Sequence, residues 1–148
     1  MLEKLSPLDK FNFLLGSWNL EYKIPKSKFS NKAEGEGQGE FKRILNNSYV
    51  SFDYTAKLDT GEAAAHAIFA WDEKSKLFRY WWFEDSGNFM KATCEFINEE
   101  TLSLNWHDSV LVQTFHKKKN DNIVLQMKFP IDENHFDTIL EVIFRKLK

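Results

Sequence analysis

The stretch Ser17-Trp18-Asn19-Leu20-Glu21-Tyr22-Lys23-Ile24 decides the fold, because apolar and polar residues alternate along it. A period of two predicts a β-strand with one buried face and one face in water. The same alternation returns in Val50-Ser51-Phe52-Asp53-Tyr54-Thr55-Ala56, after the turn signal Asn46-Asn47-Ser48. These segments predict a sheet that covers an apolar core with one of its faces.

Strand-like segments separated by short polar turns fill most of the chain on both sides of this stretch. The further segments expected as strands are 34–45, 63–71, 77–83, 89–97, 101–106, 110–116, 123–129 and 138–144. No long helical crossover separates them, so neighbouring strands should pair antiparallel. A sheet of consecutive strands keeps two open edges unless it closes on itself. We therefore predict an all-β fold, a closed up-and-down antiparallel β-barrel of about ten strands, as one domain spanning residues 1–148.

A short helical turn should precede the first strand. Ser6 is a suitable N-cap, Pro7 occupies the first helical position and Asp9 lies in the first turn. Phe11, Leu14 and Leu15 are spaced for one helical face, and Gly16 ends the segment.

Composition and charge restrict the classes of partner. Of the 148 residues 43% are hydrophobic, which excludes a disordered chain, and the net charge of −2 argues against nucleic acid and anionic membranes as partners. Cys94 is the only cysteine, so no internal disulfide can form. No run approaches the about 18 consecutive apolar residues that a membrane span needs, and residues 1–7 lack a signal-peptide core. We expect a cytoplasmic protein.

The barrel interior should bind a small, mostly hydrophobic molecule, because a barrel of this size can be filled by side chains or can hold a ligand. Apolar contact is expected from inward positions and orientation from a few polar groups. The apolar candidates are Phe52, Met90, Phe96, Leu104, Trp106 and Met127, and the polar candidates are Tyr54, His66 and Arg43. Gly35, Gly37 and Gly39 share the inward phase of Phe41. They either leave room inside or allow strong bending of the strand, and both can hold together.

The runs 63–71 and 77–83 do not alternate, and both of their faces are apolar. A strand that is apolar on both faces is buried on both. Its outer face then meets another surface, most simply a second subunit, so a homodimer through residues Ala63 to Phe83 is one hypothesis. The other is a monomer with partly exposed aromatic side chains.

The sequence Gly16-Ser17-Trp18, which opens the first strand after a helical turn, resembles the calycin superfamily of lipocalins, fatty-acid-binding proteins and nitrobindin-like barrels. The resemblance implies that Gly16 and Trp18 lie at the closed end of the barrel, with Arg145 as the late-strand arginine beside the indole. The segments Ala70-Trp71-Asp72 and Tyr80-Trp81-Trp82 are similar to a bacterial family of lipocalin-like domains of unknown function. Asp85-Ser86-Gly87 extends this likeness.

The chain departs from each named branch, and it lacks the signal peptide and the disulfides expected of secreted lipocalins. Arg145-Lys146-Leu147 replaces the Arg-x-Tyr clamp with which fatty-acid-binding proteins hold a carboxylate, and residues 137–148 lack the histidine that ligates haem in nitrobindin-like proteins. The histidines also lack zinc-binding spacing, so we expect no cofactor and no metal.

Two alternatives to a binding protein remain. His66, in an apolar strand, could serve an isomerase or hydrolase together with a nearby acid, or could simply be a hydrogen-bonded structural residue. A barrel with a filled core would instead be a ligand-free dimerisation module. Cys94 has no adjacent cation and is expected to be a buried apolar residue.

Overall fold

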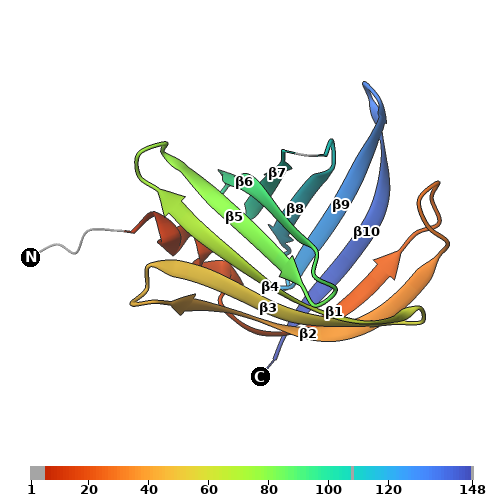
Figure 1. The fold of residues 1–148 in the computed structure, drawn as a ribbon, viewed down its shortest axis with the longest axis horizontal. Helices are drawn as coiled ribbons and strands as arrows, with labels where there is room; N and C mark the ends of the chain where they lie inside the picture. Colours follow the sequence, from red (N-terminus) through yellow and green to blue (C-terminus); the bar gives the residue numbers. More distant parts are fainter. Residues whose placement is uncertain (1–5, 108, 148) are drawn as a thin grey trace, which may run out of the picture.

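The computed structural model describes residues 6–107 and 109–147, and its ten strands form one antiparallel sheet that closes on itself (Figure 1). The strands are β1 (Gly16–Ile24), β2 (Ala33–Ile44), β3 (Tyr49–Leu58), β4 (Gly61–Asp72), β5 (Leu77–Glu84), β6 (Phe89–Asn98), β7 (Thr101–Trp106), β8 (Val112–Lys117), β9 (Ile123–Asp132) and β10 (His135–Lys146). Each strand pairs with its neighbours in sequence, and β1 also pairs with β10. The predicted up-and-down barrel is confirmed.

The strand β1 closes the barrel because both of its edges are paired. Leu20 lies opposite Gly37 on β2 and opposite Phe144 on β10. The register keeps Trp18, Leu20 and Tyr22 on the buried side, as the alternation of the sequence predicts.

One end of the barrel is closed by the 3₁₀ helix η1 (Pro7–Leu14), the red coil in Figure 1. The Ser6 hydroxyl accepts a hydrogen bond from the Leu8 amide at 3.2 Å, and the Ser6 amide donates to the Asp9 carboxylate at 3.1 Å, which forms a capping box. The buried side chains are Leu8, Phe11 and Leu14, a spacing of three that matches three residues per turn. Leu15, expected on this face, belongs instead to the extended link before β1.

The side chain of Phe11 is the centre of this closed end. It is fully buried, and its ring centre lies 4.9 Å from that of Phe69, 5.2 Å from that of Phe78 and 4.9 Å from that of Phe96. Edge and tilted aromatic contacts of this kind anchor the helix against β4, β5 and β6.

The expected partner of Trp18 is wrong by one residue. Trp18 lies opposite Lys146 in the β1–β10 register, and the Lys146 ammonium group lies 4.6 Å from the centre of its ring. Arg145 lies opposite Asn19, points to the other face of the sheet and forms an ion pair with Glu21 at 2.5 Å. Successive side chains of a strand point to opposite faces, so only one of the two cations can reach the indole.

The glycines of β2 mark a close approach of two strands. A side chain at Gly37 would meet the Thr55 carbonyl of β3, and at Gly39 the space is occupied by the Phe52 ring. The ladder between β2 and β3 is interrupted between the pairs Glu36–Lys57 and Gly39–Tyr54. These contacts favour the bending interpretation of the glycines over additional interior space.

The structure assigns faces to the two runs that are apolar throughout. Ala67, Phe69 and Tyr80 are buried inside the barrel, whereas Trp81 and Phe83 lie on the outer face with 37% and 45% exposure. Within the described residues, no helix combines the length and the hydropathy that a bilayer crossing requires.

Candidate ligand-binding site

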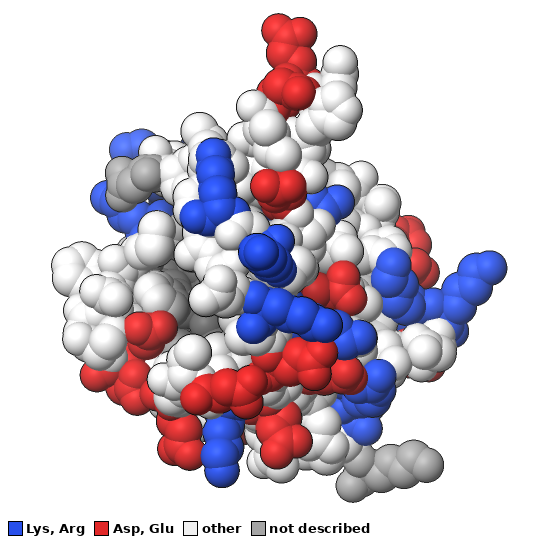
Figure 2. Space-filling model, turned by 90° about the vertical axis from the view of Figure 1, so that its right-hand side faces the viewer, with Lys and Arg blue, Asp and Glu red and all other residues white. Residues whose placement is uncertain are grey.

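A cavity of about 330 Å³ occupies the half of the barrel that lies away from η1. Figure 2 looks onto this open end and shows a hollow bordered mostly by uncharged side chains, with acidic side chains along its lower rim. The cavity is lined by Leu20, Tyr22, Phe52, Tyr54, Tyr80, Trp82, Glu84, Met90, Trp106, Leu111, Gln113, Phe115, Leu125, Met127, Leu140, Val142 and Phe144. Eight of the ten strands contribute to this list, so the cavity is the interior of the barrel itself.

Aromatic packing forms the floor of the cavity. Phe41 stacks on Phe52 with ring centres 4.0 Å apart, and Phe52 stacks in turn on Tyr54 at 4.7 Å. Phe144 of β10 packs against both Phe52 and Phe115 at 5.7 and 6.0 Å. On the η1 side of this layer, buried side chains fill the barrel. On the other side of the layer, the interior is open.

Two indole N–H groups are satisfied by polar residues of the cavity wall. Trp82 Nε1 donates to the Tyr54 hydroxyl at 2.7 Å, and Trp106 Nε1 donates to the Gln113 side-chain oxygen at 3.2 Å. The second bond orients the Gln113 amide, because its oxygen is engaged and its NH₂ group is left as a donor.

Three hydrogen-bond donors of the wall have no acceptor among the described residues: the Tyr54 hydroxyl, the Tyr80 hydroxyl and the Gln113 NH₂ group. Tyr80 and Gln113 are 3% and 5% exposed. Within the described part of the chain, the fully enclosed side-chain atoms without a partner are Arg43 Nε and Ser51 Oγ. The Tyr80 and Gln113 donors are not among these enclosed atoms, so they are in contact with open space. Both residues line the cavity, which is that space.

Burial keeps the cavity tyrosines protonated. It raises the pKa of Tyr80 well above the usual value near 10, and it also raises the pKa of Tyr54 and of Tyr22. For Tyr54 the negative charge of Glu84 adds to this effect, while the hydrogen bond from Trp82 opposes it. All three hydroxyls are neutral at physiological pH, and Tyr22 uses its proton in a 2.8 Å bond to the Thr55 carbonyl.

The residues proposed from the sequence fall into two groups. Phe52, Tyr54, Met90, Trp106 and Met127 line the cavity. Leu104 is fully buried in the core and does not line the cavity, and Phe96 packs against η1 at the closed end.

Arg43 does not reach the cavity. Its guanidinium pairs with Asp9 of η1 at 3.2 Å and donates to the Asn47 carbonyl at 2.8 Å. Arg43 shares the inward phase of Phe41 on β2, but it lies at the closed end of the barrel. There Asp9, the acid in the first turn of η1, pairs with its charge.

The expectation that His66 faces the interior is wrong. His66 Nδ1 is hydrogen-bonded to the Asp53 carboxylate, and the histidine side chain is 43% exposed on the outer face. The cause is the register of β3 and β4, which places Tyr54 and Ala65 inside and the pair Asp53–His66 outside.

Sequence reasoning missed Trp82, Glu84 and Gln113 as cavity residues. Trp82 lies in the run 77–83, whose apolar residues on both faces hide the inward phase. Gln113 carries a signal that could have been used: it shares the phase of Phe115, so an amide at that position faces the interior.

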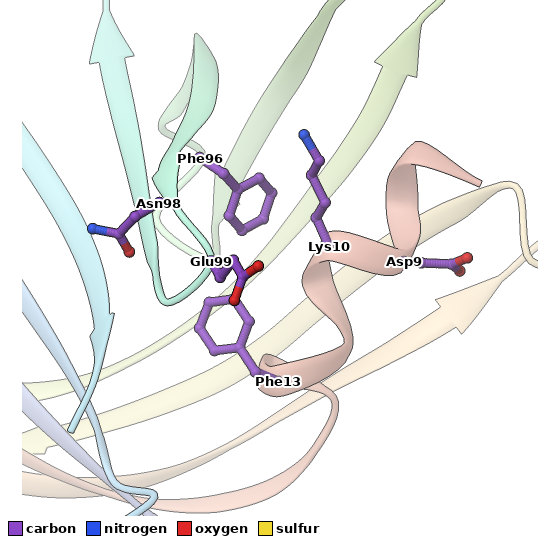
Figure 3. A pocket seen from close by; sticks show the side chains of 6 residues that line it. All are labelled: Asp9, Lys10, Phe13, Phe96, Asn98 and Glu99. Carbon is purple, nitrogen blue, oxygen red and sulfur yellow. The ribbon is translucent and has the colours of Figure 1, made fainter. Parts of the chain in front are cut away.

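A second hollow lies outside the barrel, between η1 and the turn that joins β6 to β7 (Figure 3). It measures about 460 Å³ and is lined by Phe13 and Phe96 together with Asp9, Lys10, Asn98 and Glu99. Its walls are the surface of the helix and a hairpin, and it opens to solvent. Across residues 6–107 and 109–147, no group of three or more His, Cys, Asp or Glu side chains is arranged to hold a metal ion.

The remaining candidates for chemistry are engaged or buried. Cys94 is 2% exposed and burial raises the pKa of its thiol, so it behaves as an apolar residue. His116 contacts the Thr101 hydroxyl at 2.5 Å, and His135, the first residue of β10, is exposed and pairs with Asp132 at 2.7 Å.

Comparison with known proteins places the molecule by its fold. No family model matches the sequence, and no curated protein does. The solved structure of Rv2717c from M. tuberculosis is similar with a TM-score of 0.65 and 11% identity, over 98% of this chain and 100% of that chain. A de novo designed fluorescence-activating β-barrel aligns over 94% of this chain and 98% of its own with a TM-score of 0.46 and 9% identity. At these identities the match to Rv2717c shows a shared barrel fold and nothing about function.

Proposed function

We propose that the barrel binds a small, mostly hydrophobic molecule in its interior cavity. The observation that carries this proposal is the cavity itself: about 330 Å³, lined mainly by apolar and aromatic side chains, with a few polar groups that converge on it. That volume lies at the lower end of the about 300–1,000 Å³ typical of ligand pockets. An apolar guest would remove apolar wall surface from water and gain dispersion contact with the walls.

The two alternatives have less support. The enzyme hypothesis relied on His66, which lies outside the cavity and is bonded to Asp53. The ligand-free module requires a filled core, whereas only the half of the barrel next to η1 is filled. Assignment to the calycin type remains a proposal, supported by the strand order and by the position of Gly16 and Trp18 at the closed end.

The test is a titration of the purified protein with an uncharged dye whose fluorescence rises in apolar surroundings. We expect saturable binding of one dye per chain. The variant Met127→Trp, which adds volume to a cavity wall, should lose binding while it keeps the circular dichroism spectrum of the wild type. Ile97→Trp is the matched control, because Ile97 is 60% exposed and lies outside the cavity wall. Equal binding by wild type and Met127→Trp would contradict the proposal.

A further inference from the structure

The cavity carries charge of one sign. Among the described residues that line it, Glu84 is the only charged side chain. The carboxylate belongs to the last residue of β5, close enough to the Tyr54 hydroxyl to disfavour its ionisation. Arg43 and Arg145, the cations considered for a site or for closure, are paired with Asp9 and Glu21 elsewhere in the barrel. A bound anion would therefore be desolvated beside a carboxylate, and the described wall residues include no cation to neutralise it.

Apart from the Glu84 carboxylate, the polar side chains of the cavity wall supply hydrogen-bond donors. Tyr54 accepts from Trp82 and Gln113 accepts from Trp106, so both residues offer donors to the interior. The Tyr80 hydroxyl is a third group without a partner among the described residues. A guest without any acceptor would leave these donors unpaired, and each buried donor without a partner is costly.

We propose that the natural ligand is an uncharged apolar molecule with a hydrogen-bond acceptor, such as a carbonyl or ether oxygen, and that the cavity discriminates against carboxylates. This inference rests on the proposed function and specifies the ligand class for the same cavity. Recognition then divides into two parts: the apolar wall binds the body of the molecule, and the donors of Tyr54, Tyr80 and Gln113 bind its oxygen. Glu84 supplies the discrimination by charge.

The experiment compares four medium-chain alkyl probes of equal chain length: a primary amide, a carboxylic acid, an amine and an alkane. Each competes with the uncharged dye at a pH where the acid is ionised and the amine is protonated. The amide should bind at least about tenfold more tightly than the acid. Burying an ionised carboxylate without a cation costs more free energy than burying a neutral amide. It should also bind several-fold more tightly than the alkane.

Two variants separate the contributions. Glu84→Gln should raise the affinity for the acid several-fold and leave that for the amide within about twofold. Tyr80→Phe should lower the affinity for the amide and leave that for the alkane unchanged. Glu62→Gln is the control for the first variant, since Glu62 is an exposed acid near the start of β4 and does not line the cavity.

The outcomes are distinct. Dye binding with equal affinity for amide and acid would overturn the inference and leave the binding function standing. Tighter binding of the amine than of the amide would equally overturn it, because Glu84 would then be an ion-pair partner. Failure of the dye and of all four probes to bind would overturn both the inference and the proposed function.

Discussion

The ammonium group of Lys146 lies 4.6 Å from the centre of the Trp18 ring and also donates a hydrogen bond to the Leu15 carbonyl. Its side chain reaches this position by passing over Gly16, whose φ of +124° and missing side chain leave the path open. The indole N–H of Trp18 donates to the Leu14 carbonyl at 2.8 Å. The last strand, the first strand and the end of η1 are therefore tied together at the closed end of the barrel.

Replacement of Lys146 by Met should remove both contacts of its ammonium group and retain most of the aliphatic chain. We expect the free energy of unfolding to fall by about 1 kcal/mol, the sum of a partly exposed cation–π contact and one hydrogen bond to a carbonyl. Urea unfolding followed by tryptophan fluorescence measures the change. Arg145→Met is the matched control, because its ion pair with Glu21 is exposed and should contribute less. A larger loss for Arg145→Met would restore the arginine as the closing residue.

The bend in β2 gives a second prediction. Replacement of Gly37 by Ala should destabilise the protein by about 1–3 kcal/mol, because the added methyl group would meet the Thr55 carbonyl and the ring of Tyr22. Gly87→Ala is a useful comparison: no atom lies within 4 Å of the added methyl there, and its cost would come only from a φ of +94°. Thermal unfolding by circular dichroism would measure both variants. An unchanged stability for Gly37→Ala would argue against close strand approach as the role of this glycine.

The strands and the closed barrel could be predicted from the sequence because alternation directly reports which side chains face the core. Trp18, Leu20 and Tyr22 are buried as predicted, and so are Phe52 and Trp106. These residues occur where the opposite face is polar, so the inward phase is unambiguous. The helix N-terminus could be predicted for a similar reason, since a capping box is a local sequence signal.

The errors occur where the phase is hidden or depends on register. His66 lies among alanines, so the local pattern gives no indication that β3 would pair it with Asp53 outside the barrel. The choice between Arg145 and Lys146 turns on a single residue of register between β1 and β10, which are separated by most of the chain. The size of the cavity depends on how the side chains of eight strands pack together. A sequence pattern shows which side chains face inward but not the volume that they leave empty.

The buried tyrosines predict a loss of stability at alkaline pH. Burial raises the pKa of Tyr22, Tyr54 and Tyr80, whereas the same residues in the unfolded chain titrate near pH 10. Above about pH 10 the unfolded state releases protons that the folded state retains, so the free energy of unfolding falls as pH rises. Below about pH 10 the contribution is fully present. Each tyrosine contributes up to about 1.4 kcal/mol per pH unit to the slope.

Urea unfolding at a series of pH values between about 8 and 12 measures this slope. Tyr80→Phe should reduce it by the contribution of one tyrosine, because phenylalanine has no proton to lose. The buried tyrosines should ionise, and so add to the tyrosinate absorbance, only when the protein unfolds. The same slope in wild type and Tyr80→Phe would show that the Tyr80 hydroxyl reaches solvent in the folded state.

The outer face of β5 and β6 gives the last prediction. Trp81, Phe83 and Phe89 are 37%, 45% and 75% exposed, and the register places Phe83 directly opposite Phe89. Adjacent exposed aromatic side chains of this kind are typical of an interaction surface. We expect a second copy of the chain to cover it, because one patch on each subunit suffices for a two-fold symmetric pair.

Sedimentation velocity at tens of micromolar, a concentration set by the affinity of a modest interface, should show a dimer. Phe83→Lys should shift it to monomer, because the substitution would place two like charges at the centre of the contact. Ile131→Lys adds the same charge at a 55% exposed position on β9 and should leave the dimer intact. Binding of the uncharged dye should survive in both variants, since neither residue lines the cavity. A wild-type protein that sediments as a monomer at this concentration would show that the aromatic side chains of β5 and β6 are exposed on a single barrel.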